Sequence, residues 1–116
     1  MKKLSLLLSL FIVMTSFAYA SNIGFQDGGA SKVSVLDALK MKDDGFVTVQ
    51  GNIVKRISDD KYTFKDSTGS ITVEIDNEKW NGIAVNPTDK LELTGEIEKK
   101  LNSTILDVDT VTKISK

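Results

Sequence analysis

The residue types that could do chemistry in this chain are almost all carboxylates. The sequence has no histidine and no cysteine, which excludes Ser-His and Cys-His catalysis and ordinary zinc sites. Paired carboxylates remain, and glycosidases place two of them across a substrate cleft. However, turn aspartates mostly bond their own backbone, and alternating acids on strands usually form a solvated face. We therefore predict no catalytic residues and no cofactor.

A second group of charged residues surrounds the first expected hairpin turn. Its basic members could receive an anionic sugar or a lipid phosphate, although a solubilising charge cluster would give the same pattern. Together with nearby acids, this turn and the strands beside it supply the first candidate ligand-binding set: Lys55, Arg56, Asp59, Asp60, Lys61, Lys65 and Glu74.

The opposite charge is repeated on the last two expected strands. If these strands meet near an open side, their outward acids form a cation-attracting surface made of Glu92, Glu96, Asp107 and Asp109. Calcium prefers about 6–8 oxygen ligands, and the sequence has no Asp-x-Asp-x-Asp-Gly loop, so we predict no metal site. A polycationic ligand needs only the field of the acids, with each exposed pair contributing about 0–1 kcal/mol.

The first twenty residues have the three-part pattern of a secretory signal peptide. Two lysines follow Met1, an apolar run extends over residues 4–17, and Ala18-Tyr19-Ala20 is a small-x-small cleavage site. An uncleaved anchor is the alternative, but the run is shorter than the roughly 20 apolar residues that a spanning helix needs. We predict cleavage after Ala20 and a periplasmic destination, with secretion beyond the periplasm as the alternative.

The mature chain is small and mildly acidic. Cleavage leaves 116 − 20 = 96 residues, with 15 − 2 = 13 basic and 16 acidic side chains. A net charge of −3 does not favour general polyanion binding. Residues 21–33 are rich in Gly, Ser and Asn and are expected to form a flexible leader, followed by one folded domain over residues 34–116.

Hydrophobic periodicity predicts an all-β domain. A short helix is expected over residues 35–42, and strands over 46–57, 61–66, 70–76, about 91–98 and 103–114, with a helical turn through Trp80. Gly51 and Gly95 interrupt two strands, and we expect a bulge or bend at each. This order predicts a small five-stranded Greek-key OB-fold barrel with a helical turn between its third and fourth strands. A generic β-sandwich is the alternative.

Specific segments strengthen this prediction. "GNIVKRISDDKYTFKDSTGSITVEID", followed by "KWNG" and later "LTGEIEK", resembles the bacterial OB-fold (BOF) family of periplasmic stress-induced proteins, the YgiW/YdeI type. The resemblance covers roughly residues 36–113. It implies a small exported β-barrel associated with envelope stress tolerance and no established enzymatic activity, and it leaves the ligand open.

We therefore interpret the chain as a non-enzymatic periplasmic binding module. Its expected partner is an envelope component: a glycan, a lipopolysaccharide headgroup, a cationic peptide or an outer-membrane protein. A small glycan hydrolase and a single-strand nucleic-acid binder are the alternatives. Nucleic acid is not expected, because the outward positions of the second and third strands carry no aromatic ring for base stacking and Trp80 is expected to plug one end of the barrel.

Overall fold

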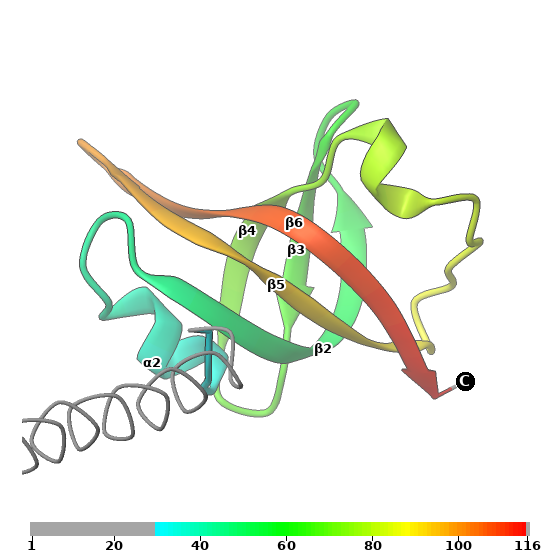
Figure 1. Ribbon diagram of the computed structural model, residues 1–116, viewed down its shortest axis with the longest axis horizontal. Helices are drawn as coiled ribbons and strands as arrows, with labels where there is room; N and C mark the ends of the chain where they lie inside the picture. The colour runs from blue at the N-terminus through cyan, green and yellow to red at the C-terminus, as the bar shows by residue number, and fades with distance from the viewer. Residues whose placement is uncertain (1–29, 116) are drawn as a thin grey trace, which may run out of the picture.

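The computed structural model describes residues 30–115, and Figure 1 shows a strongly curved sheet with helical segments at its margins. The predicted signal peptide and residues 21–29 of the predicted leader lie outside the described residues. The elements in chain order are β1 (Ser31–Lys32), α2 (Val35–Leu39), β2 (Phe46–Arg56), β3 (Lys61–Lys65), β4 (Ser70–Glu74), the 3₁₀ helix η1 (Asn77–Trp80), β5 (Lys90–Lys100) and β6 (Ser103–Ser115).

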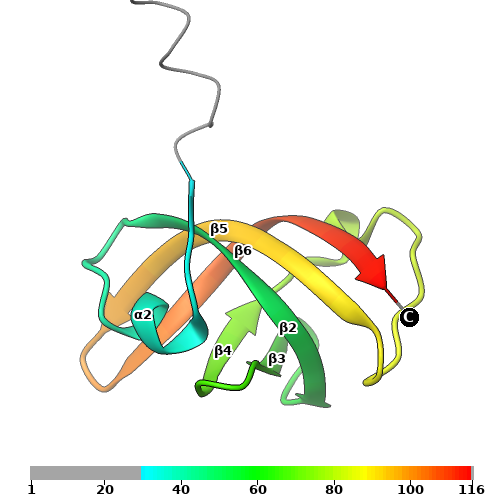
Figure 2. The ribbon, with the colours of Figure 1, turned by 90° about the horizontal axis from the view of Figure 1, so that it is seen from below.

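The strands close into the predicted OB-fold barrel. Their order is β1-β2-β3-β4-β6-β5, and β5 pairs back onto β2. β4 and β6 run parallel, whereas the other pairs among β2–β6 are antiparallel. Figure 2 shows the long strands β2, β5 and β6 curving around the shorter β3 and β4. The five predicted strands and the helical turn between the third and fourth are confirmed.

The barrel interior is aliphatic and follows the predicted alternation of inward and outward residues. Phe64 of β3, Val73 of β4 and Leu93 of β5 are completely buried, and their sequence neighbours point outward. Together with the other buried apolar side chains they form one continuous hydrophobic core, against which Trp80 packs from the end of η1. Burial of this core supplies the main driving force for folding. Among residues 30–115, no helix is long and apolar enough to cross a membrane.

Strand β1 lies inside the segment that the sequence assigned to a flexible leader. Ser31 and Lys32 pair in parallel with Val47 and Thr48 of β2, and the Val33 amide donates to the Thr48 carbonyl oxygen at 2.9 Å. Both β1 side chains are exposed. Backbone pairing to a free strand edge needs no apolar side chains, so the absence of an apolar pattern could not reveal this strand.

The helix is shorter than predicted, ending at Leu39 rather than Lys42. Ser34 caps its start by accepting a hydrogen bond from the Asp37 amide at 3.1 Å, as expected. Beyond Leu39 the chain turns through Asp44, which has a positive φ of 73°. Within the helix, Val35 is buried and Leu36 is 44% exposed.

Gly51 does not mark a bulge. The register of β2 against β3 shifts between Ile53 and Lys55, so the irregularity follows the glycine by a few residues. Gly51 is needed for a different reason: a Cβ there would overlap the Lys65 carbonyl oxygen. At Gly95 the expected bend is present, because the register of β5 against β6 shifts between Thr94 and Gly95.

Asp66 ties the β3–β4 turn to α2. One carboxylate oxygen accepts the Val35 amide at 3.0 Å, and the other accepts the Thr68 amide at 2.7 Å, the Thr68 hydroxyl at 2.6 Å and the Gly69 amide at 3.2 Å. Burial alone would raise the pKa of Asp66, but these hydrogen bonds from Thr68, Val35 and Gly69 hold it below its ordinary value.

We expect Asp66→Ala to lower the free energy of unfolding by about 1–2 kcal/mol at neutral pH, because it leaves several amides without their acceptor. Since the pKa of Asp66 is depressed in the folded protein, this contribution is present above the unfolded pKa and is lost as the pH falls through the folded one. Urea unfolding of both proteins at several pH values measures it, and a difference that grows on acidification would contradict the assignment.

Candidate functional site: a carboxylate-lined face

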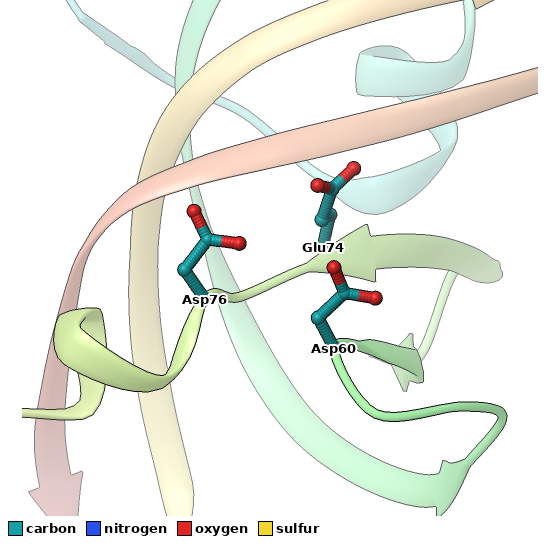
Figure 3. Close-up of side chains that lie close together, drawn as sticks. All are labelled: Asp60, Glu74 and Asp76. Atoms are coloured by element: carbon teal, nitrogen blue, oxygen red, sulfur yellow. The ribbon is translucent and has the colours of Figure 1, made fainter.

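Three carboxylates meet where β3 begins and β4 ends. Asp60 directly precedes β3, Glu74 is the last residue of β4, and Asp76 follows two residues later. One carboxylate oxygen from each lies within 4.8 Å of the others, and Figure 3 shows the three side chains rising from the two adjacent strand ends. The backbone fixes this arrangement, because the Ile75 amide donates to the Asp60 carbonyl oxygen at 2.8 Å.

The acidic surface continues onto the last two strands. Parallel pairing places Asp107 of β6 opposite Glu74, and antiparallel pairing places Glu96 of β5 opposite Asp107. Glu98 and Asp109 also act electrostatically on Asp107. We define the acidic face as these carboxylates taken together: Asp60, Glu74, Asp76, Glu96, Glu98, Asp107 and Asp109.

Lysines neutralise the acidic face incompletely. Lys61 lies 3.7 Å from Asp60 and 4.0 Å from Glu74, measured between nitrogen and carboxylate oxygen. Lys79 approaches Asp109 at 3.9 Å, and Lys100 approaches Glu98 at 3.8 Å. All four contacts are long, and the side chains are partly exposed, so each contributes little stability. Three lysines against the seven acids of the face leave an excess of negative charge.

The two central acids are destabilised in their charged forms. Burial raises the pKa of Glu74, and Asp107, Asp60 and Asp76 add to the effect while Lys61 opposes it. Burial likewise raises the pKa of Asp107, with Glu98, Asp109 and Asp76 adding to it against Lys79. The charged forms of Glu74 and Asp107 are therefore disfavoured in the folded protein, and a bound cation would relieve this cost.

A groove of about 480 Å³ adjoins the three clustered carboxylates. It is lined by the β2–β3 loop and the start of η1, with the residues Ser58, Asp59, Asp60, Asp76, Asn77 and Glu78. Asp59 and Glu78 thus extend the negative charge beyond the sheet. The arrangement can attract and coordinate positive groups, and its carboxylates supply only oxygen ligands.

The predicted basic set is dispersed by the fold. Lys61 lies within the acidic face, whereas Lys65 lies at the other end of β3, about 13 Å away along the strand. Arg56 folds back onto its own loop, donating to the carbonyl oxygens of Ser58 and Asp59 at 3.1 and 3.2 Å. It also lies 5.7 Å from the centre of the Tyr62 ring. Lys55 is exposed on β2.

The predicted acidic set is partly brought together. Glu96, Asp107 and Asp109 share the acidic face, but Glu92 lies apart, paired with Gln50 and Thr112. Glu74 and Asp60, which we grouped with the basic residues, belong to the acidic face instead. Asp76 and Glu98 are absent from both predicted sets. The parallel pairing of β4 with β6 creates this grouping, and no local pattern in the sequence indicates which residues it will place side by side.

Aromatic residues border the face without forming a stacking platform. Tyr62 is buried, and its ring meets Trp80 edge-on, with centroids 5.6 Å apart and an interplanar angle of 85°. Trp80 is partly buried against the core. The role of Trp80 as a plug at one end of the barrel stays a prediction.

Comparisons with known proteins agree with this fold. Residues 14–113 match the family described as bacterial OB fold (BOF) proteins. The chain is 47% identical to the protein YgiW of Escherichia coli K12 over 85 residues, which cover 73% of this chain and 65% of YgiW, just under two thirds of that relative's length. It is 41% identical to the calcium-regulated OB-fold protein CarO of Pseudomonas aeruginosa over 90 residues, covering 76% of this chain and 78% of CarO.

A solved structure gives the same result. The structure of YgiW from E. coli superposes with a TM-score of 0.71, covering 73% of this chain and 91% of that one at 47% identity. The two chains therefore share the same fold.

Proposed function

We propose that this chain, which belongs to the bacterial OB-fold (BOF) protein family, is a non-enzymatic binding module of the periplasm whose acidic face holds a cationic ligand. The ligand class is a polyamine, a cationic peptide or a divalent cation encountered in the cell envelope. A contribution to envelope stress tolerance follows if such ligands accumulate under stress.

The observation that carries this proposal is the convergence of carboxylates from three strands around Glu74 and Asp107. Their raised pKa values indicate that the folded protein holds negative charge where it is unfavourable, and binding sites commonly retain charge of this kind. The position of the acidic face also supports the proposal, because OB-folds bind ligands on the face of their second and third strands and on the adjoining loops. Here those elements are β3, β4 and the loop that contains Asp60.

Other sequence features support binding rather than catalysis. Without histidine or cysteine the chain lacks the usual nucleophile–base pairs. The signal-peptide pattern of residues 1–20 supports the periplasmic assignment. The name of CarO refers to calcium regulation of that protein, which motivates including Ca²⁺ among the cations tested.

The proposal is tested by NMR titration of the isotope-labelled mature chain with spermidine, an oligolysine peptide and CaCl₂ in separate samples. We expect chemical-shift changes concentrated at Asp60, Glu74, Asp76 and the β6 segment around Asp107. The affinity should fall with added salt, because exposed charges are screened over roughly 10 Å at 0.1 M ionic strength.

The control is sodium chloride at matched ionic strength, which should move few of these signals. If none of the three cations shifts the acidic face, or if shifts are equally large around Glu92, the proposed ligand class is wrong. Detectable release of sugar from cell-wall material, abolished by Glu74→Gln, would instead make the chain a hydrolase.

A further inference from the structure

A second charged cavity lies at the other end of β3, in a gap along one edge of β2. On that edge, β1 pairs with β2 as far as Thr48, and β3 pairs with it from Asn52 onward. Among residues 30–115, no strand covers the edge between these two positions. The gap opens into a cleft of about 600 Å³, within the 300–1,000 Å³ typical of small-molecule sites.

Lysines from three separate strands line this cleft. They are Lys32 of β1, Lys65 of β3 and Lys90 of β5. All three are exposed, and within the described part of the chain none of them has a carboxylate within 4.0 Å. Other lysines of the described residues, such as Lys42 and Lys55, also lack an ion pair, but Lys32, Lys65 and Lys90 differ from them in lining one cleft together.

One carboxylate shares the cleft, but its oxygens are occupied. Asp66 accepts four hydrogen bonds from Val35, Thr68 and Gly69. Counting its charge against the three lysines leaves 3 − 1 = +2 at the cleft. A phosphate monoester carries a charge of about −1.5 to −2 at neutral pH, so it would balance the positive charge of the cleft.

Neutral polar groups complete the lining. Gln50 and Ser67 offer an amide and a hydroxyl at the wall. Asn52 is fixed, because its side-chain amide donates to the carbonyl oxygens of Pro87 and Asp89 at 3.1 and 2.9 Å. These bonds hold the start of β5, and with it Lys90, beside β2. Gly51 also lines the cleft, and its missing side chain lets the Lys65 backbone pack directly against β2.

We infer that this cleft binds the phosphate group of a small phosphorylated molecule of about sugar size, with Lys32, Lys65 and Lys90 contacting the phosphate oxygens. Lysine is a common phosphate ligand because its ammonium group is a compact positive charge. The site is separate from the acidic face and has the opposite charge, so the two can be lost independently.

Isothermal titration and NMR shift mapping of the mature chain with glucose 1-phosphate test this inference. We expect saturable shifts at residues 50–52 and 65–67 and at Lys90. Lys65→Gln and Lys90→Gln should each weaken binding about fivefold, because each removes one charge-assisted hydrogen bond. Lys65→Arg should retain most of the affinity. Lys42→Gln, at an exposed lysine outside the cleft, is the matched control and should leave it unchanged.

Three further compounds identify the source of the phosphate. Inorganic phosphate should compete with glucose 1-phosphate, whereas glucose should not. Co-sedimentation of the protein with vesicles containing phosphatidic acid reports whether the cleft also binds a lipid headgroup. Lys65→Gln and Lys90→Gln should each reduce this co-sedimentation. Absence of shifts at the cleft with every phosphate compound, equal competition by sulfate, or binding insensitive to Lys65→Gln and Lys90→Gln would overturn the inference.

Discussion

Replacing Gly95 by alanine is expected to lower the free energy of unfolding by about 3 kcal/mol. Gly95 is buried on β5 where the register against β6 shifts, and a Cβ there would overlap the carbonyl oxygen of Asp107 and crowd the Val108 backbone. Both obstacles are backbone atoms of a paired strand, so they cannot rotate away as a flexible side chain would. The strands must separate locally to admit one methyl group.

Gly69→Ala is the matched control for this substitution. Its Cβ would lie 3.9 Å from Val35 Cγ1, which is an ordinary van der Waals contact, and its φ is outside the left-handed region. We expect its effect to stay within about 0.5 kcal/mol. Urea unfolding monitored by Trp80 fluorescence gives both values. Equal stability of the two variants would mean that β5 and β6 are not packed as closely as described.

Gly95 also connects the fold with the acidic face. The close approach of β5 and β6 at this point positions Asp107 opposite Glu96 and beside Glu74. Because Gly95→Ala pushes directly on the Asp107 backbone, it should weaken cation binding as well as stability. Folded Gly95→Ala protein that binds spermidine as well as the unchanged chain would show that the register of β6 does not matter for the face.

The sequence predicts the barrel well because its strands carry a strict alternation. Ile71, Val73 and Ile75 point into the core as expected, since a period of two residues leaves one consistent inward face. The short edge strand β1 could not be predicted, because its two exposed residues take part through the backbone alone. Gly51 illustrates an ambiguity: a glycine in a strand indicates either a bulge or a close approach, and only the position of Lys65 decides between them.

The site is harder to predict than the fold for a topological reason. Glu74 and Asp107 are far apart in sequence, and the parallel pairing of β4 with β6 makes them neighbours. Lys61 and Lys65 show the converse: they are close in sequence, but they lie at opposite ends of β3, Lys61 beside Glu74 and Lys65 at the lysine-lined cleft. Charge patterns along the chain therefore identify which residues are outward, but not which of them share a surface.

Neutralising the centre of the acidic face with Glu74→Gln and Asp107→Asn together should weaken spermidine binding about 30-fold, taking roughly 1 kcal/mol for each lost charge contact. The same double substitution should make the protein more stable near neutral pH. Both carboxyl groups have raised pKa values, chiefly through burial, so their charged forms oppose folding. The amide side chains that replace them have nearly the same size and shape but carry no charge. Glu92→Gln, at an acid outside the face, is the control and should change neither property.

The pH dependence separates this explanation from a general loss of structure. A folded pKa above the unfolded one means that the charged group destabilises the fold above the folded pKa, and that this destabilisation disappears as the pH falls below the unfolded pKa. The stability advantage of the double variant should therefore shrink as the pH is lowered toward the ordinary values of 4.5 for Glu74 and 3.8 for Asp107. Cation affinity of the unsubstituted chain should decline over the same pH range, because protonation of the carboxylates competes with the ligand. At neutral pH, the measured heat of binding should depend on the buffer only through any protons that the ligand displaces.

A joint outcome follows for the double variant, namely higher stability with lower affinity. A functional surface retains charge that opposes folding when that charge favours binding. Removing the charge should therefore raise the stability of the fold and lower the affinity for the ligand. If the double variant is instead less stable at neutral pH, the ion pairs of Lys61 outweigh the repulsion among the acids, and the face is a structural charge network. If stability rises while spermidine affinity is unchanged, the cationic ligand binds elsewhere on the barrel.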